Sequence, residues 1–159
     1  MFSGLETRQL PLIDVTFDEL DERITVLVNR YGPPLLRYAI GVVFVWFGAL
    51  KTIGVSPAGE LVAATVYFVP AELFVPVLGI WEVAIGLCLL YRPLVPVGIL
   101  LLAVQMPGTF LPILLFPDVV FTVFPYGLTI EGQYIVKNLV LISAALVVGG
   151  RVRAEQRIA

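Results

Sequence analysis

The sequence contains no histidine, and its only cysteine is Cys88. Haem and zinc sites depend on histidine or cysteine ligands, and a disulfide needs two cysteines. These absences argue against a metalloenzyme or a dithiol enzyme that works by itself, so we predict no catalytic residue and no metal site. Charge is also scarce, at 14% of 159 residues with a net charge of −2, and no basic stripe recurs. The chain therefore does not resemble a nucleic-acid-binding protein.

Hydrophobic residues, by contrast, make up 59% of the chain. Soluble domains carry about 25% charged residues, well above the fraction found here. The composition predicts an all-α membrane protein, and four apolar segments have about the length that a bilayer demands. The predicted spans, at about residues 35–53, 73–91, 93–116 and 132–149, form a four-helix bundle within residues 33–150.

Residues 1–32 precede the first span, and residues 16–31 place apolar side chains three or four positions apart. This spacing predicts an amphipathic helix that lies at the membrane interface or packs on a partner. Pro33 and Pro34 are expected to end that helix and redirect the chain.

Two apolar connectors are too short or too irregular to cross a bilayer. The first connector, at residues 55–68, is predicted to form a short helix at the membrane interface. The second, at residues 116–130, is predicted to form an aromatic loop at headgroup level. Within the third span, Pro107 and Gly108 favour a kink or local unwinding.

Basic residues determine the predicted orientation. With four spans, all eight arginines fall on one side: Arg8, Arg23, Arg30, Arg37, Arg92, Arg151, Arg153 and Arg157. The other side has only Lys51 and Lys137, near helix ends. By the positive-inside rule, both termini are cytoplasmic, including the tail at 151–159.

Polar side chains inside the spans are the candidate functional residues. Glu82 lies near the middle of the second span, where an unpaired charge costs at least about 2.5 kcal/mol. Lys51, Lys137 or both are its candidate partners in a structural ion pair, while Gln105 and Asn138 add amides at comparable depth. Glu82, Gln105, Lys137 and Asn138 thus form a candidate polar pocket, which either fixes helix register or binds a ligand or proton.

Glycines mark where the first two spans should approach closely. Gly41 and Gly48 share a helical face with Lys51, and Gly79 and Gly86 flank Glu82 on its face. Small residues allow helix backbones to touch in membranes, so we expect these charges to point into the bundle.

Three segments, RYAIGVVFVWFGALKTIG from Arg37, WEVAIGLCLLY from Trp81 and EGQYIVKNLVLISAALVVGG from Glu131, resemble the DoxX-like family of small bacterial and archaeal membrane proteins. The resemblance covers roughly residues 34–151 and implies a four-helix bundle in a prokaryotic cell membrane. The family-like positions are Gly48, Lys51, Glu82, Gly86, Gly132, Lys137 and Asn138.

The resemblance also implies a functional setting. The family is similar in name and origin to a subunit of a thiosulfate:quinone oxidoreductase, and other members are linked to membrane complexes that handle oxidative stress. We therefore expect a redox-linked, quinone-associated subunit without chemistry of its own and without a covalently bound cofactor. A quinone carbonyl would accept a hydrogen bond from Lys137 or Asn138, and Glu82 would handle a proton.

Two other functions remain open. The chain could be a structural accessory subunit of a larger complex, surrounded by lipid and docked to other membrane or peripheral subunits through residues 16–31. A small transporter is the weaker alternative, because the sequence shows no inverted repeat. The N-terminal helix distinguishes the accessory role, since that role needs a docking element and no polar pocket.

Overall fold

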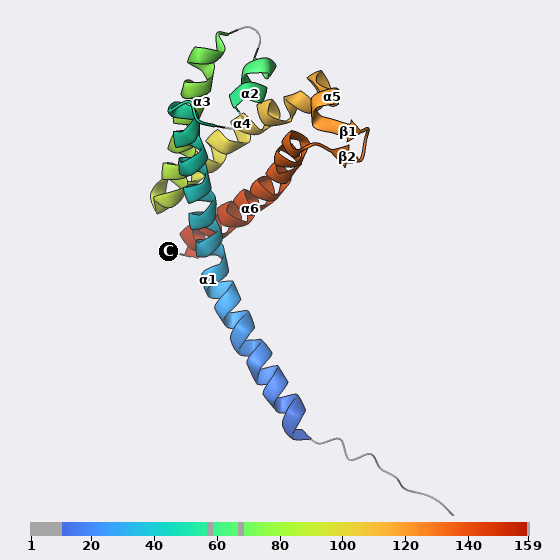
Figure 1. Cartoon of the computed structure of the whole chain (residues 1–159). Coiled ribbons are helices and arrows are strands. Elements are labelled where there is room, and N and C mark those ends of the chain that lie inside the picture. Colours follow the sequence, from blue (N-terminus) through green and yellow to red (C-terminus); the bar gives the residue numbers. More distant parts are fainter. Residues whose placement is uncertain (1–10, 57–58, 67–68, 159) are drawn as a thin grey trace, which may run out of the picture.

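The computed structural model of the protein describes residues 11–56, 59–66 and 69–158, and it is mostly helical (Figure 1). The elements in chain order are α1 (Pro11–Thr52), α2 (Gly59–Thr65), α3 (Ala71–Leu90), the 3-10 turn η1 (Arg92–Leu94), α4 (Val95–Leu115), α5 (Pro117–Val120), β1 (Phe121–Val123), β2 (Gly127–Leu128) and α6 (Ile130–Ile158).

In the described part of the chain, four helices are long and apolar enough to cross a membrane. They are Phe17–Thr52, Ala71–Leu90, Arg92–Leu115 and Ile130–Ala154. Each of these helices coincides with one predicted span to within a residue at the C-terminal end of the first three, so the prediction of four helices long and apolar enough to span a membrane is confirmed.

The four long helices pack in a ring. The most extensive contact is between α1 and α3. In addition, α3 packs on α4, α4 packs on α6, and α6 packs on α1. Their interior is aliphatic with one aromatic ring, and the buried side chains are Ile40, Phe44, Ile85, Leu89, Val95, Leu102, Met106, Ala144, Ala145, Val148 and Val152. Burial of this apolar surface holds the helices together where they face one another.

The first helix is longer than predicted. Pro33 and Pro34 lie inside α1, so the prediction that they end an N-terminal helix is wrong. Proline's fixed φ suits a helix, and the lost N–H groups do not stop the amphipathic segment before the prolines and the apolar segment after them from remaining helical. Residues 17–31, here called the arm, are exposed along their whole length and project beyond the bundle (Figure 1).

Two other expectations change in detail. α4 stays helical through Pro107, so the predicted local unwinding does not occur. α6 continues to Ile158, which makes part of the predicted C-terminal tail a direct extension of the last span.

The connectors both contain short regular elements. The first forms the short helix α2, as predicted, while the second forms α5 and an antiparallel hairpin of β1 and β2 instead of a loop. The Thr129 hydroxyl accepts a hydrogen bond from the Gly132 N–H at 3.0 Å and donates to the Val119 carbonyl at 2.7 Å. A Cβ on Gly132 would collide with the Val120 carbonyl oxygen, so glycine allows α5 to pack against α6.

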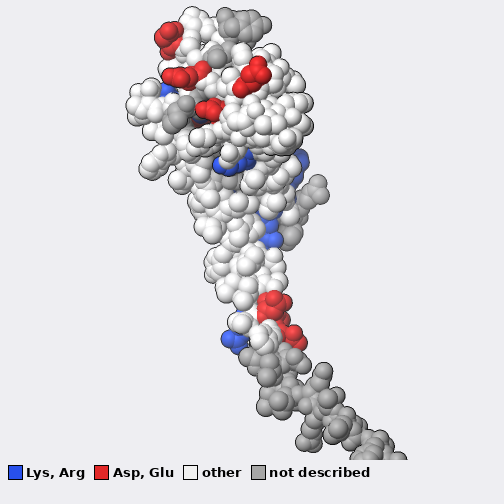
Figure 2. All heavy atoms as spheres, turned by 45° about the vertical axis from the view of Figure 1, so that its right-hand side comes forward, with Lys and Arg blue, Asp and Glu red and all other residues white. Residues whose placement is uncertain are grey.

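Charge is divided between the two ends of the bundle. Figure 2 shows acidic side chains gathered at the end of the bundle away from the arm and basic ones at the end nearer the arm, while the arm itself carries side chains of both signs. The acidic end contains the first turns of α2, α3, α5 and α6, which hold Glu60, Glu72, Asp118 and Glu131. Acidic groups are favourable at helix N-termini, because the helix dipole is positive there.

Candidate functional site

Two glycine contacts bring α1 and α3 together. A Cβ on Gly48 would lie 2.6 Å from the Gly79 carbonyl oxygen, and a Cβ on Gly79 would lie 2.6 Å from the Gly48 oxygen. Further along the same helices, a Cβ on Gly86 would lie 2.6 Å from the Gly41 oxygen. The predicted close approach of the first two spans is therefore confirmed.

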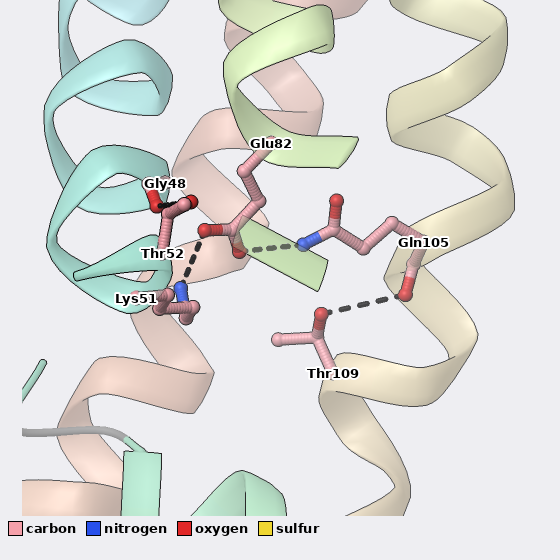
Figure 3. Close-up of polar contacts among 6 residues, drawn as sticks. All are labelled: Gly48, Lys51, Thr52, Glu82, Gln105 and Thr109. Atoms are coloured by element: carbon pink, nitrogen blue, oxygen red, sulfur yellow. Dashed lines mark hydrogen bonds and ion pairs between the residues drawn. The ribbon is translucent and has the colours of Figure 1, made fainter. Parts of the chain in front are cut away.

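This contact places Lys51 beside Glu82, because each follows its contact glycine by about one helical turn. The Lys51 Nζ lies 2.5 Å from Glu82 Oε2, and the two side chains are 10% and 9% exposed. The other carboxylate oxygen, Oε1, accepts a hydrogen bond from Gln105 Nε2 of α4 at 2.8 Å (Figure 3). Lys51, Glu82 and Gln105, which we call the polar cluster, thus join three helices.

Gln105 leaves one polar atom without a partner in the described structure. Its Oε1 is buried and accepts no hydrogen bond. The nearby Thr109 hydroxyl does not donate to this side-chain oxygen. It donates to the backbone carbonyl oxygen of Gln105 at 3.4 Å (Figure 3). An unsatisfied buried acceptor costs about 1–3 kcal/mol, so the cluster contains an acceptor that a ligand donor would stabilise.

Lys137 and Asn138 do not join the polar cluster, which corrects their predicted place in the pocket and in the ion pair. Lys137 is exposed, and its Nζ lies 5.3 Å from the ring centroid of Tyr134. Asn138 Nδ2 donates to the Tyr134 and Ile135 carbonyls of its own helix at 3.0 and 3.1 Å. The cause is rotation about α6, because Lys137 lies about 200° around the helix from the buried Ile135.

Arg37 was predicted only to anchor the topology, yet its side chain is buried. It is 9% exposed, and its Nη1 lies 3.4 Å from the carbonyl oxygens of Leu89 and Leu90 at the end of α3. Its spacing was the available signal, because Arg37 lies on the helical face of Gly41 and Gly48.

The polar cluster can hold a proton and make hydrogen bonds, but its residues do not resemble a metal site. It offers one carboxylate, one ammonium and one amide. Among the described residues, no three His, Cys, Asp or Glu side chains gather as a metal ion would require. Its chemistry is therefore that of donors and acceptors within an apolar bundle.

Four apolar helices of this length define a multi-pass membrane protein. Comparisons of the chain with family models, with curated proteins and with solved structures found no match.

Proposed function

We propose that the chain is a redox-linked membrane subunit of DoxX-like type, whose polar cluster receives the head group of a quinone. The observation that carries this proposal is the buried, unpartnered Oε1 of Gln105 beside the Lys51–Glu82 pair. Ionisable groups within a membrane mark ligand or proton sites by default. Here the ionisable pair lies beside the unpaired acceptor of Gln105.

The donors and acceptors of the cluster fit a quinol better than a quinone carbonyl. Gln105 Oε1 would accept a hydrogen bond from a quinol hydroxyl, while Nε2 of the same amide stays bonded to Glu82. Glu82 is the group of the cluster that can take up a proton, and Lys51 holds its carboxylate in place. When bound, the quinone supplies the electron-carrier chemistry that the side chains lack.

The finer topology belongs to the same proposal. The basic end of the bundle, with both termini, faces the cytoplasm of a prokaryotic cell, in agreement with the positive-inside rule. The polar cluster then lies nearer the outer face, because Lys51 is in the last turn of α1.

Gln105→Leu tests the quinone site, with Asn138→Leu as the matched control. Both changes remove a span amide, but only Gln105 contacts Glu82. We expect quinone retained by the purified protein, measured in its lipid extract, to fall about tenfold with Gln105→Leu, the loss expected for one hydrogen bond. We expect Asn138→Leu to retain it. Equal retention in both variants, or no quinone in the unaltered protein, would refute the site.

A second candidate function is that of an accessory subunit docked through the arm. Phe17, Leu20, Ile24, Leu27 and Tyr31 recur at alternating steps of three and four residues, and all are about half exposed or more. Such a stripe is what a helix presents to a groove or a second helix. Since α1 continues from the bundle into the arm, we propose that the stripe packs on another subunit of the complex rather than lying flat on lipid.

The docking role is tested with the double variant Leu20→Ser and Leu27→Ser, and with Val26→Ser as control. Val26 is equally exposed but lies outside the stripe, about 100° around the helix from Leu27 and about 120° from Leu20. The double variant should migrate as a smaller species on a native gel in mild detergent, having lost a stoichiometric partner, while the control keeps the partner. A partner that survives the double change would contradict docking through the arm.

A further inference from the structure

A pocket lies at the basic end of the bundle, far along α1 and α3 from the polar cluster. Its volume is about 490 Å³, within the range of roughly 300–1,000 Å³ for ligand pockets. Arg37 from α1, Arg92 from η1 and Arg151 from α6 line it, and none of its described lining residues is acidic. We call it the arginine pocket, since three cations from three elements converge there.

Arg37 is held in place by the protein itself. Its Nη1 bonds to the Leu89 and Leu90 carbonyls, two of the last groups of α3, which have no donor within the helix. Its Cζ also lies 4.4 Å from the ring centroid of Tyr38. A guanidinium carries five N–H donors, so this arginine can serve α3 and an anion together. Because it is already ordered, little conformational freedom remains to be lost on binding.

The rest of the pocket wall is apolar or aromatic. Leu90, Val148 and Val152 give it an aliphatic side, and Tyr38 and Tyr91 stand beside the arginines. Tyrosine prefers the headgroup level of a membrane, where one end of the ring is wet. A ligand that suits this wall combines an anionic group with hydrocarbon.

The position of the pocket fits a lipid. One spanning helix ends at Leu90 and the next begins at Arg92, so the pocket lies where the spans leave the hydrocarbon core. Phosphate oxygens suit the planar fork of arginine, which can donate two parallel hydrogen bonds. We propose that the arginine pocket binds an anionic phospholipid, with its phosphate among the guanidinium groups and an acyl chain along the aliphatic side.

The experiment uses the full chain, purified and delipidated in a neutral detergent. Binding is measured by native mass spectrometry with phosphatidylglycerol, with phosphatidylcholine and with inorganic phosphate. The test variants are Arg92→Gln and Arg151→Gln, because Arg37→Gln also removes the cap on α3. Arg153→Gln is the matched control, an exposed arginine of α6 outside the pocket lining.

We expect phosphatidylglycerol to bind in preference to phosphatidylcholine, and its affinity to fall about tenfold in each test variant, as the loss of a charge-assisted hydrogen bond would produce. Arg153→Gln should bind like the unaltered protein. Inorganic phosphate that competes at equal concentration would assign the pocket to a free anion and overturn the lipid proposal. Equal weakening by Arg153→Gln would likewise overturn it, since the effect would then be one of general surface charge.

Discussion

Glu82 is the residue on which three helices converge. Its two carboxylate oxygens take different donors, the ammonium of Lys51 and the amide of Gln105. A charge buried among apolar helices is tolerated when such donors satisfy it, and removing one donor leaves a desolvated charge without compensation. The cluster therefore fixes how α1, α3 and α4 are placed relative to one another.

Replacing one partner of the ion pair should be worse than replacing both. Lys51→Met leaves a buried carboxylate and is expected to cost about 3 kcal/mol or more in unfolding free energy. Combining it with Glu82→Gln removes the uncompensated charge, so the double variant should be more stable than the sum of the single losses predicts. Denaturant unfolding in detergent micelles measures all three variants, and strictly additive losses would show that the two side chains do not interact.

Sequence patterns predicted part of this site and missed part of it. Glu82 and Gln105 were identifiable because polar groups in apolar spans need partners, and glycine spacing pointed Lys51 toward Glu82. Lys137 and Asn138 were misplaced, because depth in the membrane can be estimated from residue numbers but the rotation of a helix about its axis cannot. On α6, that rotation directs Lys137 to Tyr134 and outward.

At the scale of elements, the α1–α3 contact depends on backbone against backbone. Gly48 and Gly79 meet where a methyl group on either would lie 2.6 Å from a carbonyl oxygen of the other helix. Backbone atoms cannot move aside as a side chain can, so any larger residue must separate the helices.

Gly48→Ala and Gly79→Ala are each expected to lower the unfolding free energy by about 1–3 kcal/mol through overpacking. Gly108→Ala is the control, because it makes the same change within α4 at a position where, apart from the local helix backbone, no atom lies within 4 Å of the added carbon. It should be neutral or slightly stabilising, since alanine favours a helix. If all three variants unfold alike, close glycine packing does not hold α1 against α3.

Element ends were predicted less well than element positions. The paired prolines looked like a helix stop, yet α1 passes through them. Local preference is a weak guide when the segments on both sides are helical. The strands β1 and β2 have only three and two residues, too few to show the alternation of apolar and polar side chains that marks a strand. The sequence there therefore predicted only a loop.

At the scale of the whole molecule, charge distinguishes the two ends of the bundle. The predicted consequence is that the acidic end faces outward and the basic end stays in the cytoplasm. The four-span count rested on long, apolar segments, which are among the most dependable sequence signals. The packing order of the helices, in contrast, depends on side-chain fit and could not be predicted from composition.

Labelling of introduced cysteines tests the orientation. In a Cys88→Ser background, which contains no other cysteine, Asp118→Cys and Arg153→Cys place exposed thiols at opposite ends of the bundle. A membrane-impermeant maleimide should label the Asp118→Cys variant in intact cells, and the Arg153→Cys variant only after permeabilisation. The reverse pattern would invert the topology, and labelling of both variants in intact cells would show that α6 does not cross the membrane between these two sites.

The two prolines within α1 have a mechanical consequence. Without N–H groups at Pro33 and Pro34, the carbonyls of Asn29 and Arg30 lose their usual helical donors, so α1 bends there more easily than elsewhere. That weak point separates the arm from the bundle and lies about five turns from Lys51. If a partner moves the arm, α1 would bend at Pro33 and Pro34, and the helices around Glu82 would keep their alignment.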